Sequence, residues 1–585
     1  MSQVVHKVTA KVTALSLIPT TSVIPNCFML AITQKFLVAC ATMMGLSATH
    51  TQAQPPAQLT HIAAANPKAA GFAAPNILSA ELEQIVWANG AMKLENPTAL
   101  IGFYGYNNDG PHMPAPGAVQ APGSNVEASK TEPDKNTYLV LHEQTGPDSN
   151  YDYGSHFLFQ GHEGGKRGYI TRINLDADGA HRITLMADKD VNDKSLPAFD
   201  GSTWYPWAQV LLFTAEAGKN VGVWQATASY PSVVEDISGI LGRGGYEGIQ
   251  ADSDGNLWIV EDVSGKAGTA NKNAKQPNSF IYRFIPKNKH DLRAGGKLQA
   301  LQVASKRHAG PIVFNPADPD GDIFSDDIKD LHTYGLTFHT RWVVIHDTDV
   351  EGFAPFDANA AAKLKKATPF KRPENGIFRP GTAFGEFYFT ETGDKNKNTE
   401  AGVDFGGFGG IFKISQKDPS SDSGRLTIFY KSDIAHTGFD NIAFWSKNKV
   451  IVVEDAGDSL HTQRNALDSA YLFDMNTDYA KQVNQPIRIL AQGRDPSATI
   501  DSALNDAHSA NGFQNDGDNE ITGIHISDGD PTAYGILGAK NPRPFRDGWR
   551  VFYTQQHGDN ITYEIIPARQ LHPSSRHEWN AHDAD

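Results

Sequence analysis

Acidic residues recur at matching points of a repeated pattern in this sequence. Three runs of alternating apolar residues each end in Glu, followed by Asp or Thr and a small-residue turn; these residues are Glu261, Glu391 and Glu454. A second acid precedes each of them by 14 to 17 residues in a similar setting; these earlier acids are Glu247, Glu374 and Asp440. Carboxylates that are crowded in a low-dielectric site repel one another, so a ring of them requires cations. The repeat therefore predicts a metal site, and hard ions suit it best.

Several strands must converge to bring these acids to one place. The chain of 585 residues contains 53 Gly and 33 Pro, and only residues 357–366 have the pattern of a short helix. Turns with Asp-Gly or Gly-Asn pairs, such as Asp178-Gly179, join the apolar runs and suit tight hairpins. Hairpins with an internal repeat predict an all-β fold, a β-propeller whose innermost strands face a central channel. At roughly 40–50 residues for a bare blade, the chain allows six blades with long loop insertions and few short helices.

The composition excludes some classes of partner and site. The formal charge is −15 and the isoelectric point is near 5.8, whereas a nucleic-acid partner requires a basic surface. No Gly-x-Ser-x-Gly elbow and no Walker-type Gly-Lys-Ser/Thr loop occurs. Residues 318–322 resemble a calcium loop, but Lys329 stands where such a loop needs its closing Glu, so we predict a surface turn there. We expect a monomer that acts on a small molecule.

The N-terminus predicts export through a Sec-type signal peptide. Lys35 precedes the apolar run at residues 36–45, and small residues end the segment before Gln54. Met29 is an alternative start that would leave a compact signal. The apolar run is shorter than the ~20 residues that a membrane span requires, so we expect no integral span. The protein is then periplasmic or secreted; the alternative is a lipoprotein, because residues 37–40 resemble a lipobox.

The domain organisation follows from this export segment. We predict an export signal at residues 1–53, a linker rich in Ala, Pro and Gln at residues 54–76, and a single β-propeller domain at residues 77–585. Both cysteines, Cys27 and Cys40, lie in the export signal. The mature protein would then have no thiolate to act as nucleophile or metal ligand, so oxygen and nitrogen atoms must build any site.

Nine short motifs follow one another along the chain. They are Gly161-His162-Glu163, Pro206-Trp207, Tyr246-Glu247-Gly248, Val260-Glu261-Asp262, Tyr282-Arg283-Phe284, Arg372-Pro373-Glu374, Phe439-Asp440-Asn441, Glu520-Ile521-Thr522-Gly523 and Gln556-His557-Gly558. This ordered series, within about residues 137–567, resembles the PhoX-type alkaline phosphatases, which are exported bacterial enzymes. The resemblance implies a six-bladed propeller with a calcium–iron cluster in its channel.

The resemblance also implies roles for individual residues. The metal ligands that it implies are Glu163, Asp200, Glu247, Glu261, Glu374 and Glu520. Further candidates share the repeat pattern: Glu391, Asp440 and Glu454, although Asp440 could equally cap a turn. Arg372 would clamp a phosphoryl group through its fork of donors, or else pair with a nearby acid. His557 would act as an acid or a ligand, or else be held by the backbone at a strand end.

Asp200 is the main departure from the family. Counting back from Pro206-Trp207 places it where the family has a cysteine that binds iron. Because a carboxylate is a harder ligand than a thiolate, the substitution favours calcium or magnesium over iron. We therefore expect calcium as the cofactor, with iron as the alternative.

These inferences predict an exported, metal-dependent phosphatase that hydrolyses small phosphate monoesters. One rival is a propeller that calcium stabilises and that binds a glycan or a protein without catalysis. A second rival is a calcium-dependent lactonase or phosphodiesterase on the same scaffold. Metal analysis of the purified protein beside a phosphomonoester assay separates the three.

Overall fold

The computed structural model describes residues 58–68, 75–109, 128–493, 520–557 and 560–568. The chain divides into two units, residues 1–51 and residues 52–585, and every described residue belongs to the second. The predicted export signal, with Cys27 and Cys40, and part of the predicted linker lie outside the described residues. Within the described ranges, no helix is both long and apolar enough to cross a membrane.

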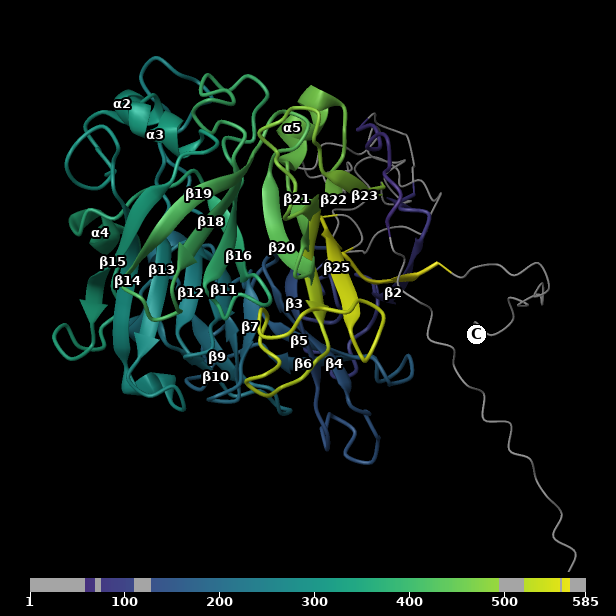
Figure 1. Cartoon of the computed structure of the whole chain (residues 1–585). Coiled ribbons are helices and arrows are strands. Elements are labelled where there is room, and N and C mark those ends of the chain that lie inside the picture. The colour runs from purple at the N-terminus through teal and green to yellow at the C-terminus, as the bar shows by residue number, and fades with distance from the viewer. Residues whose placement is uncertain (1–57, 69–74, 110–127, 494–519, 558–559, 569–585) are drawn as a thin grey trace, which may run out of the picture. The chain divides into compact units, whose positions relative to one another are not determined.

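The described strands form five antiparallel sheets (Figure 1). Two four-stranded sheets hold, in spatial order, β3 (Pro133–Val140), β4 (His156–His162), β5 (Ile170–Asn174) and β6 (Ile183–Ala187), and β7 (Ser202–Tyr205), β8 (Val210–Phe213), β9 (Trp224–Thr227) and β10 (Val234–Asp236). The nine-stranded sheet holds β11 (Tyr246–Ala251), β12 (Leu257–Glu261), β13 (Ile281–Pro286), β14 (Gly296–Val303), β15 (Phe338–Asp347), β19 (Ser423–Lys431), β18 (Gly410–Gln416), β17 (Glu386–Glu391) and β16 (Pro373–Phe378). The last two hold β1 (Ile77–Leu78), β23 (Ile487–Ala491), β22 (Ser469–Asp474), β21 (Lys449–Glu454) and β20 (Phe439–Ser446), and β2 (Leu82–Ala88), β26 (Ile561–Pro567), β25 (Arg550–Gln556) and β24 (Glu520–Ser527).

Six strands from these sheets contact one another in a closed ring. The contacts run from β3 to β7, β11, β16, β20 and β24, and β24 in turn contacts β3. Each of the six begins a run of antiparallel strands that lie progressively farther from the ring. The runs that begin at β11 and β16 join through β15 and β19, which makes the nine-stranded sheet. The prediction of a mostly β fold is confirmed.

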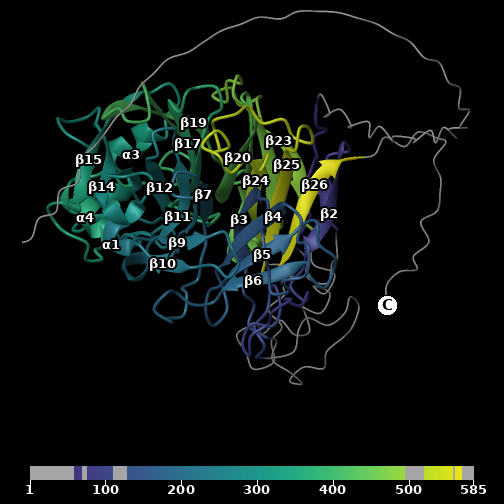
Figure 2. The same cartoon turned by 90° about the horizontal axis from the view of Figure 1, so that it is seen from below.

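The two ends of the described chain close this arrangement. Strand β2 pairs with β26, in a register that places Leu82 opposite Pro567 and Ala88 opposite Thr562. Figure 2 shows the purple β2 beside the yellow β26. Strand β1 likewise pairs with the outer strand β23. The outermost strands of two sheets therefore come from the N-terminal side of the domain, which fastens its ends together.

The six ring strands are buried on both faces because each lies between neighbouring sheets. All residues of β11 and β16 are buried. Apolar clusters fill the space between the sheets; Trp258 on β12, for example, is 1% exposed and its ring lies 5.1 Å from that of Phe378 on β16. Truncating such a buried aromatic side chain to alanine costs about 3–5 kcal/mol. Polar side chains on the ring strands are consequently held inside a rigid frame.

The helices are few and short: α1 (Ser238–Leu241), α2 (Pro319–Ile323), α3 (Asp326–Leu331), α4 (Ala358–Leu364), α5 (Gly457–Arg464) and the 3-10 turns η1 (Gly218–Asn220) and η2 (Leu292–Ala294). The helix predicted at residues 357–366 is confirmed as α4, whose capping residue Asp357 accepts a hydrogen bond from the amide of Ala360. The predicted surface turn at residues 318–322 is wrong. This segment forms α2, because Asp318 caps the Gly321 amide and Pro319 suits a first helical position.

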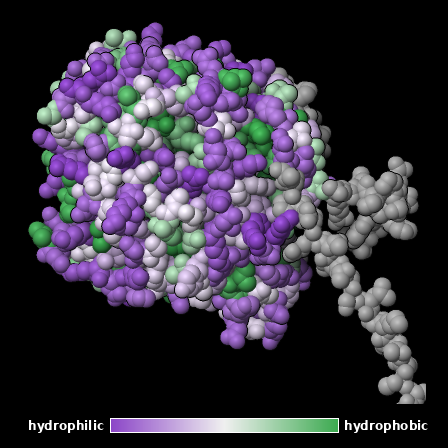
Figure 3. All heavy atoms as spheres, in the orientation of Figure 1, coloured by the Kyte–Doolittle hydropathy of each residue, from purple (hydrophilic) through white to green (hydrophobic). Residues whose placement is uncertain are grey.

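The surface offers no single large apolar face in the view of Figure 3, where most residues are hydrophilic and apolar ones form small separate groups. The most exposed large apolar side chains of the described part are Val350, Leu364, Val483 and Tyr534. They lie on different elements, and single exposed apolar residues are normal. The chemistry of this protein is therefore to be sought in its interior.

Candidate metal centre

A cavity of about 80 Å³ is lined entirely by side chains of ionisable types. The lining residues are Asp134, Glu163, Asp200, Glu216, Glu247, Arg372, Glu374, Lys395, Asp440, Asp455, Glu520 and His557. Nine of these twelve residues are acidic, so negative charge dominates the cavity. Eight of the eleven site residues proposed from the sequence are among them: Glu163, Asp200, Glu247, Arg372, Glu374, Asp440, Glu520 and His557.

A shared backbone irregularity places four of the acids. In β3, β11, β16 and β20, three residues of the ring strand span the same length as two residues of its neighbour. The acid is the first residue inside this bulge each time; the four are Asp134, Glu247, Glu374 and Asp440. A β-bulge turns side chains away from the regular alternation of a strand, and it commonly does so next to active sites. The bulges thus turn four carboxylates toward one cavity.

The strands that pair with β11 and β20 also direct residues toward the cavity, each from the position that follows the last paired residue. Glu261, Glu391 and Glu454 lie directly opposite the residue that precedes each bulge acid. Successive side chains of a strand point to opposite faces, so the following residue faces the other way. Asp455, which follows Glu454, lines the cavity, and Asp262, which follows Glu261, pairs with the cavity residue Arg372.

Glu261, Glu391 and Glu454 themselves do not line the cavity, and each has other partners. Glu261 Oε2 accepts hydrogen bonds from the Phe280 amide, the Tyr282 hydroxyl and Asn359 Nδ2 at 3.0, 2.9 and 3.0 Å. Glu391 accepts from His332 Nε2 at 2.8 Å and from the amide of Lys371 at 2.6 Å. The carboxylate of Glu454 accepts hydrogen bonds from both terminal nitrogens of Arg464, at 3.1 and 3.0 Å. These three acids hold strand ends and loops together.

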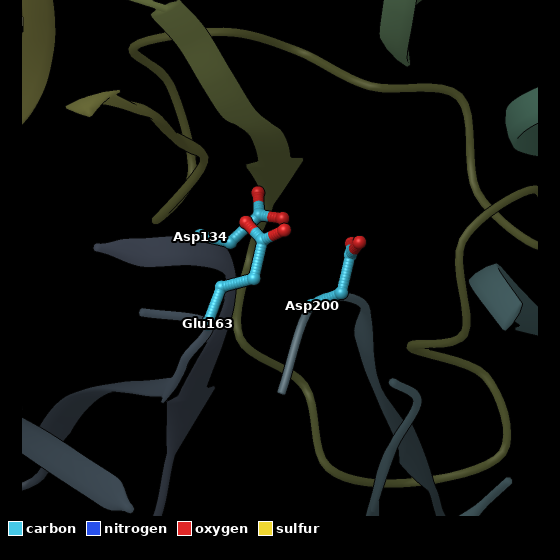
Figure 4. Close-up of side chains that lie close together, drawn as sticks. All are labelled: Asp134, Glu163 and Asp200. Atoms are coloured by element: carbon cyan, nitrogen blue, oxygen red, sulfur yellow. The ribbon is translucent and has the colours of Figure 1, made fainter. Parts of the chain in front are cut away.

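Three overlapping groups of carboxylates could each hold a metal ion. They are Asp134, Glu163 and Asp200; Asp200, Glu216 and Glu247; and Glu247, Glu374 and Asp440. Within each group the nearest ligand atoms lie within 4.8 Å of one another. Figure 4 shows the carboxyl groups of Asp134 and Glu163 beside each other, with that of Asp200 a short way from them. Because Asp200 and Glu247 each belong to two groups, the three candidate positions are contiguous.

The donor set and its electrostatics fit hard cations. Burial, followed by repulsion from neighbouring carboxylates, raises the pKa of Glu163, of Asp200 and of Glu247 well above the usual range. Glu374 Oε1 is buried and accepts no hydrogen bond from any described residue. Cations among these oxygens would satisfy that atom and allow the carboxylates to ionise. Oxygen donors in this number are the ligands that calcium prefers.

Arg372 enters the cavity in a fixed orientation. Its Nε donates a hydrogen bond to Asp262 Oδ1 at 2.8 Å, and its Nη2 donates to the other oxygen of the same carboxylate. Its Nη2 also lies 3.7 Å from Glu374 Oε1. The backbone of Arg372 is left-handed, with φ of 58°. Such a conformation is uncommon outside glycine, costs about 1–3 kcal/mol and concentrates at functional sites.

His557 lies between two carboxylates. Its Nε2 is 3.0 Å from Glu520 Oε2, and its Nδ1 is 3.2 Å from Glu132 Oε1. Burial lowers the pKa of His557, but the Glu132 and Glu520 carboxylates outweigh burial and raise the pKa well above its usual value. Each ring nitrogen faces one carboxylate oxygen. Its backbone is also left-handed, with φ of 65°.

Sequence reasoning missed four lining residues: Asp134, Glu216, Lys395 and Asp455. Two of them carried a usable signal. Pro133-Asp134 repeats the proline–acid pair of Pro373-Glu374, and Asp455 directly follows the recurring Glu. Glu216 and Lys395 lie in loops without a repeated pattern, so no such signal marks them.

Comparison with known proteins gives one family. A family model described as alkaline phosphatase PhoX matches residues 272–534, and no curated protein sequence matches the chain. Among solved structures, Pseudomonas fluorescens PhoX in complex with vanadate is 12% identical, with 87% of this chain and 98% of that chain covered and a TM-score of 0.47. A Synechocystis apocarotenoid oxygenase mutant is 8% identical, with coverage of 80% and 93% and a TM-score of 0.27. Pseudomonas brassicacearum lignostilbene dioxygenase is 9% identical, with coverage of 77% and 94% and a TM-score of 0.25.

The family match bears directly on the motifs. Residues 272–534 include the Arg372-Pro373-Glu374, Phe439-Asp440-Asn441 and Glu520 to Gly523 elements. The resemblance predicted from the ordered motifs is confirmed by this match, and the match supports a phosphatase.

Proposed function

We propose that this chain, which resembles the PhoX alkaline phosphatase family over residues 272–534, is an exported metal-dependent phosphatase that hydrolyses phosphate monoesters at its acidic cavity. The observation that carries the proposal is the placement of nine carboxylates around one cavity beside Arg372. Gathered carboxylates suit calcium, and a guanidinium suits the phosphoryl group. We take calcium as the cofactor, with iron as the alternative that the Asp200 carboxylate disfavours.

The metal ligands proposed here are the acids that line the cavity together. They are Asp134, Glu163, Asp200, Glu247, Glu374, Asp440 and Glu520. Divalent ions, when bound, supply neutralisation of charge on phosphoryl oxygens and a more acidic bound water. Glu261, Glu391 and Glu454 have the different role of fastening strand ends, because protein donors bind Glu261 Oε2 and both oxygens of Glu391 and of Glu454.

Arg372 is the residue that would bind the transferred group. Asp262 engages Nε and Nη2, which leaves Nη1 of this cavity-lining residue to bind an anion. The guanidinium stays charged at any working pH and would stabilise charge that develops on the phosphoryl oxygens. His557 contacts Glu520 through Nε2 and would orient that carboxylate, beside the role of acid or ligand that the family resemblance implies.

Two variants separate these roles. Arg372→Ala should keep the fold and the metal content while it lowers turnover by roughly 10²–10³, the factor for a lost transition-state donor. Glu374→Ala should lower both metal content and turnover, because it removes one carboxylate of a shared group. Arg379→Ala is the matched control, since Arg379 bonds to Glu386 at 3.1 Å and does not line the cavity.

The measurements are the initial rate on a generic phosphomonoester with calcium supplied and the metal content of each variant. Full activity in Arg372→Ala would keep a phosphatase but reject this site. A wild-type protein that binds calcium and hydrolyses no monoester would favour the calcium-stabilised binding propeller. Hydrolysis of lactones or phosphodiesters instead would favour the second rival.

The architecture and the location are further parts of the proposal. A six-bladed propeller is supported by the closed ring of six strands, each of which begins an antiparallel run. Export to the periplasm or the medium is supported by the apolar run near residues 36–45. N-terminal sequencing of the secreted protein tests the export signal, and residues 1–53 should be missing from it.

A further inference from the structure

The cavity contains a second cation that the sequence patterns did not indicate. Lys395 lines the same cavity as Arg372, and its Nζ pairs with a carboxylate oxygen of Asp455. Burial and the Arg372 charge lower the pKa of Lys395, but Glu374 and other carboxylates outweigh them and raise it. The Lys395 side chain is therefore an ammonium in a small cavity that is also lined by nine acids, Arg372 and His557.

Lys395 and Arg372 are held in equivalent ways. Both belong to the segment that contains β16 to β19, since Arg372 precedes β16 and Lys395 follows β17. Asp262 and Asp455 hold them, and each of these aspartates directly follows a recurring Glu at the end of a neighbouring strand. One segment thus presents two cations, and the runs on either side of it supply one aspartate each. Neither aspartate belongs to the three carboxylate groups that could hold metal ions.

The loop that carries Lys395 is fastened on several sides. Its neighbour Asp394 pairs with the buried Lys371 ammonium at 3.1 Å and accepts from Thr399 Oγ1 at 2.6 Å. On the other side, the amide of Lys397 donates to Gln463 Oε1 at 2.6 Å. The Glu400 carboxylate accepts hydrogen bonds from the amides of residues 272, 273 and 274. The contacts of its neighbours therefore fix the backbone position of Lys395.

The backbone adds a second sign of constraint. Lys395 has φ of 46°, and Arg372 has φ of 58°. A left-handed conformation is uncommon in residues other than glycine, and surrounding contacts hold Lys395 and Arg372 in it.

We propose that Lys395 is a second phosphoryl-binding residue, which contacts a non-bridging oxygen of the bound phosphate monoester and of the product phosphate beside Arg372. This inference rests on the proposed function, since it names a further contact of the same site. Two neighbouring cations repel each other, and a dianion between them removes that repulsion. An ammonium acts on such an oxygen as a point charge, and a guanidinium acts through paired donors. The pair would therefore hold the phosphoryl group in the cavity that the metal-binding carboxylates also line.

The test compares Lys395→Met with Lys397→Met in the full-length protein loaded with calcium. Lys397 belongs to the same loop, is exposed and does not line the cavity, so it controls for the loss of one positive charge. Two quantities are measured: the apparent Kd for inorganic phosphate, from the rise in melting temperature with phosphate concentration, and KM on a generic phosphomonoester. Lys395→Met should weaken both by about 10- to 100-fold, the loss expected for one hydrogen bond to a charged group, and it should keep its metal content. Lys397→Met should match the wild type.

Asp455→Asn separates anion binding from a structural role. If Lys395 binds phosphate, the freed ammonium in Asp455→Asn keeps or tightens phosphate binding, and the double variant Lys395→Met/Asp455→Asn behaves like Lys395→Met. If the ion pair only holds the loop, Asp455→Asn and Lys395→Met weaken phosphate binding equally, and the proposal is overturned.

The outcomes also distinguish this proposal from the proposed function. Phosphate binding that depends on Lys395 in a protein without hydrolytic activity would support the Lys395 site and reject the phosphatase. Hydrolysis with unchanged KM and phosphate affinity in Lys395→Met would keep the phosphatase and reject the Lys395 site. A wild-type protein that neither binds phosphate nor hydrolyses the ester would reject both.

Discussion

Glu261 and Glu247 belong to the same repeat, yet the structure gives them different roles, and Glu261→Ala tests that difference. Glu261 does not line the cavity, and its Oε2 accepts three hydrogen bonds from Phe280, Tyr282 and Asn359. Glu247 lines the cavity and belongs to two of the carboxylate groups. Removing the Glu261 carboxylate should therefore reduce stability and leave the metal content of the folded protein unchanged.

The expected loss of stability follows from the three donors that would lose their acceptor. Each buried donor left without a partner costs about 1–3 kcal/mol, so the sum is roughly 3–6 kcal/mol after partial relaxation. Large domains lose about 2 °C in Tm per kcal/mol at the lower end, so Tm should fall by roughly 6–12 °C. Glu261→Gln keeps one oxygen acceptor and the shape of the side chain, so its loss should be smaller.

The assay is thermal denaturation of calcium-loaded protein together with elemental analysis of the folded fraction. Glu247→Ala is the comparison, because it should lower metal content and should no longer gain stability from added calcium. If Glu261→Ala instead loses metal as Glu247→Ala does, then Glu261 does not face away from the cavity. Glu261 would then return to the ligand set implied by the family resemblance.

The remaining predictions concern metals and pH. Excess EDTA should lower Tm, because ions bound only to the folded state stabilise it; an unchanged melting curve with no metal by elemental analysis would contradict the metal site. Asp200→Cys should raise iron content at the expense of calcium, since it replaces a shared carboxylate with a softer ligand; stoichiometric iron in the wild type would refute the hardness argument. Burial raises the pKa of Glu261 from 4.5 to about 8, so the folded protein keeps a proton that the unfolded chain releases. Stability should therefore fall as the pH rises from about 4.5 to about 8, and Glu261→Gln should flatten that fall in denaturant titrations; an equal slope in both proteins would exclude this assignment.

Repetition made part of the fold predictable from the sequence. The Glu that ends each alternating run marked the strands at residues 257–261, 386–391 and 449–454, and the helix at residues 357–366 was also recovered. The sequence could not show that β2 completes a sheet with β26, because strand pairing between distant segments leaves no local pattern. It also did not reveal α2, where a capping aspartate outweighed the turn-like composition.

The site was predictable to the extent that acids recurred on the ring strands. The face of each acid was harder to predict, because a bulge shifts the alternation of side chains by one position. Glu374 and Glu391 belong to the same repeat, yet one lines the cavity and the other binds His332. Lys395 lies in a loop that distant contacts shape, and the resemblance to known motifs did not include it.

The most direct test of the central claim is the hydrolysis of a generic phosphomonoester by purified protein before chelation, after chelation and after calcium is restored. A metal-dependent phosphatase at the carboxylate-lined cavity predicts activity that EDTA abolishes and that calcium restores. Activity that persists in excess chelator, or no activity with calcium, magnesium or iron supplied, would contradict it.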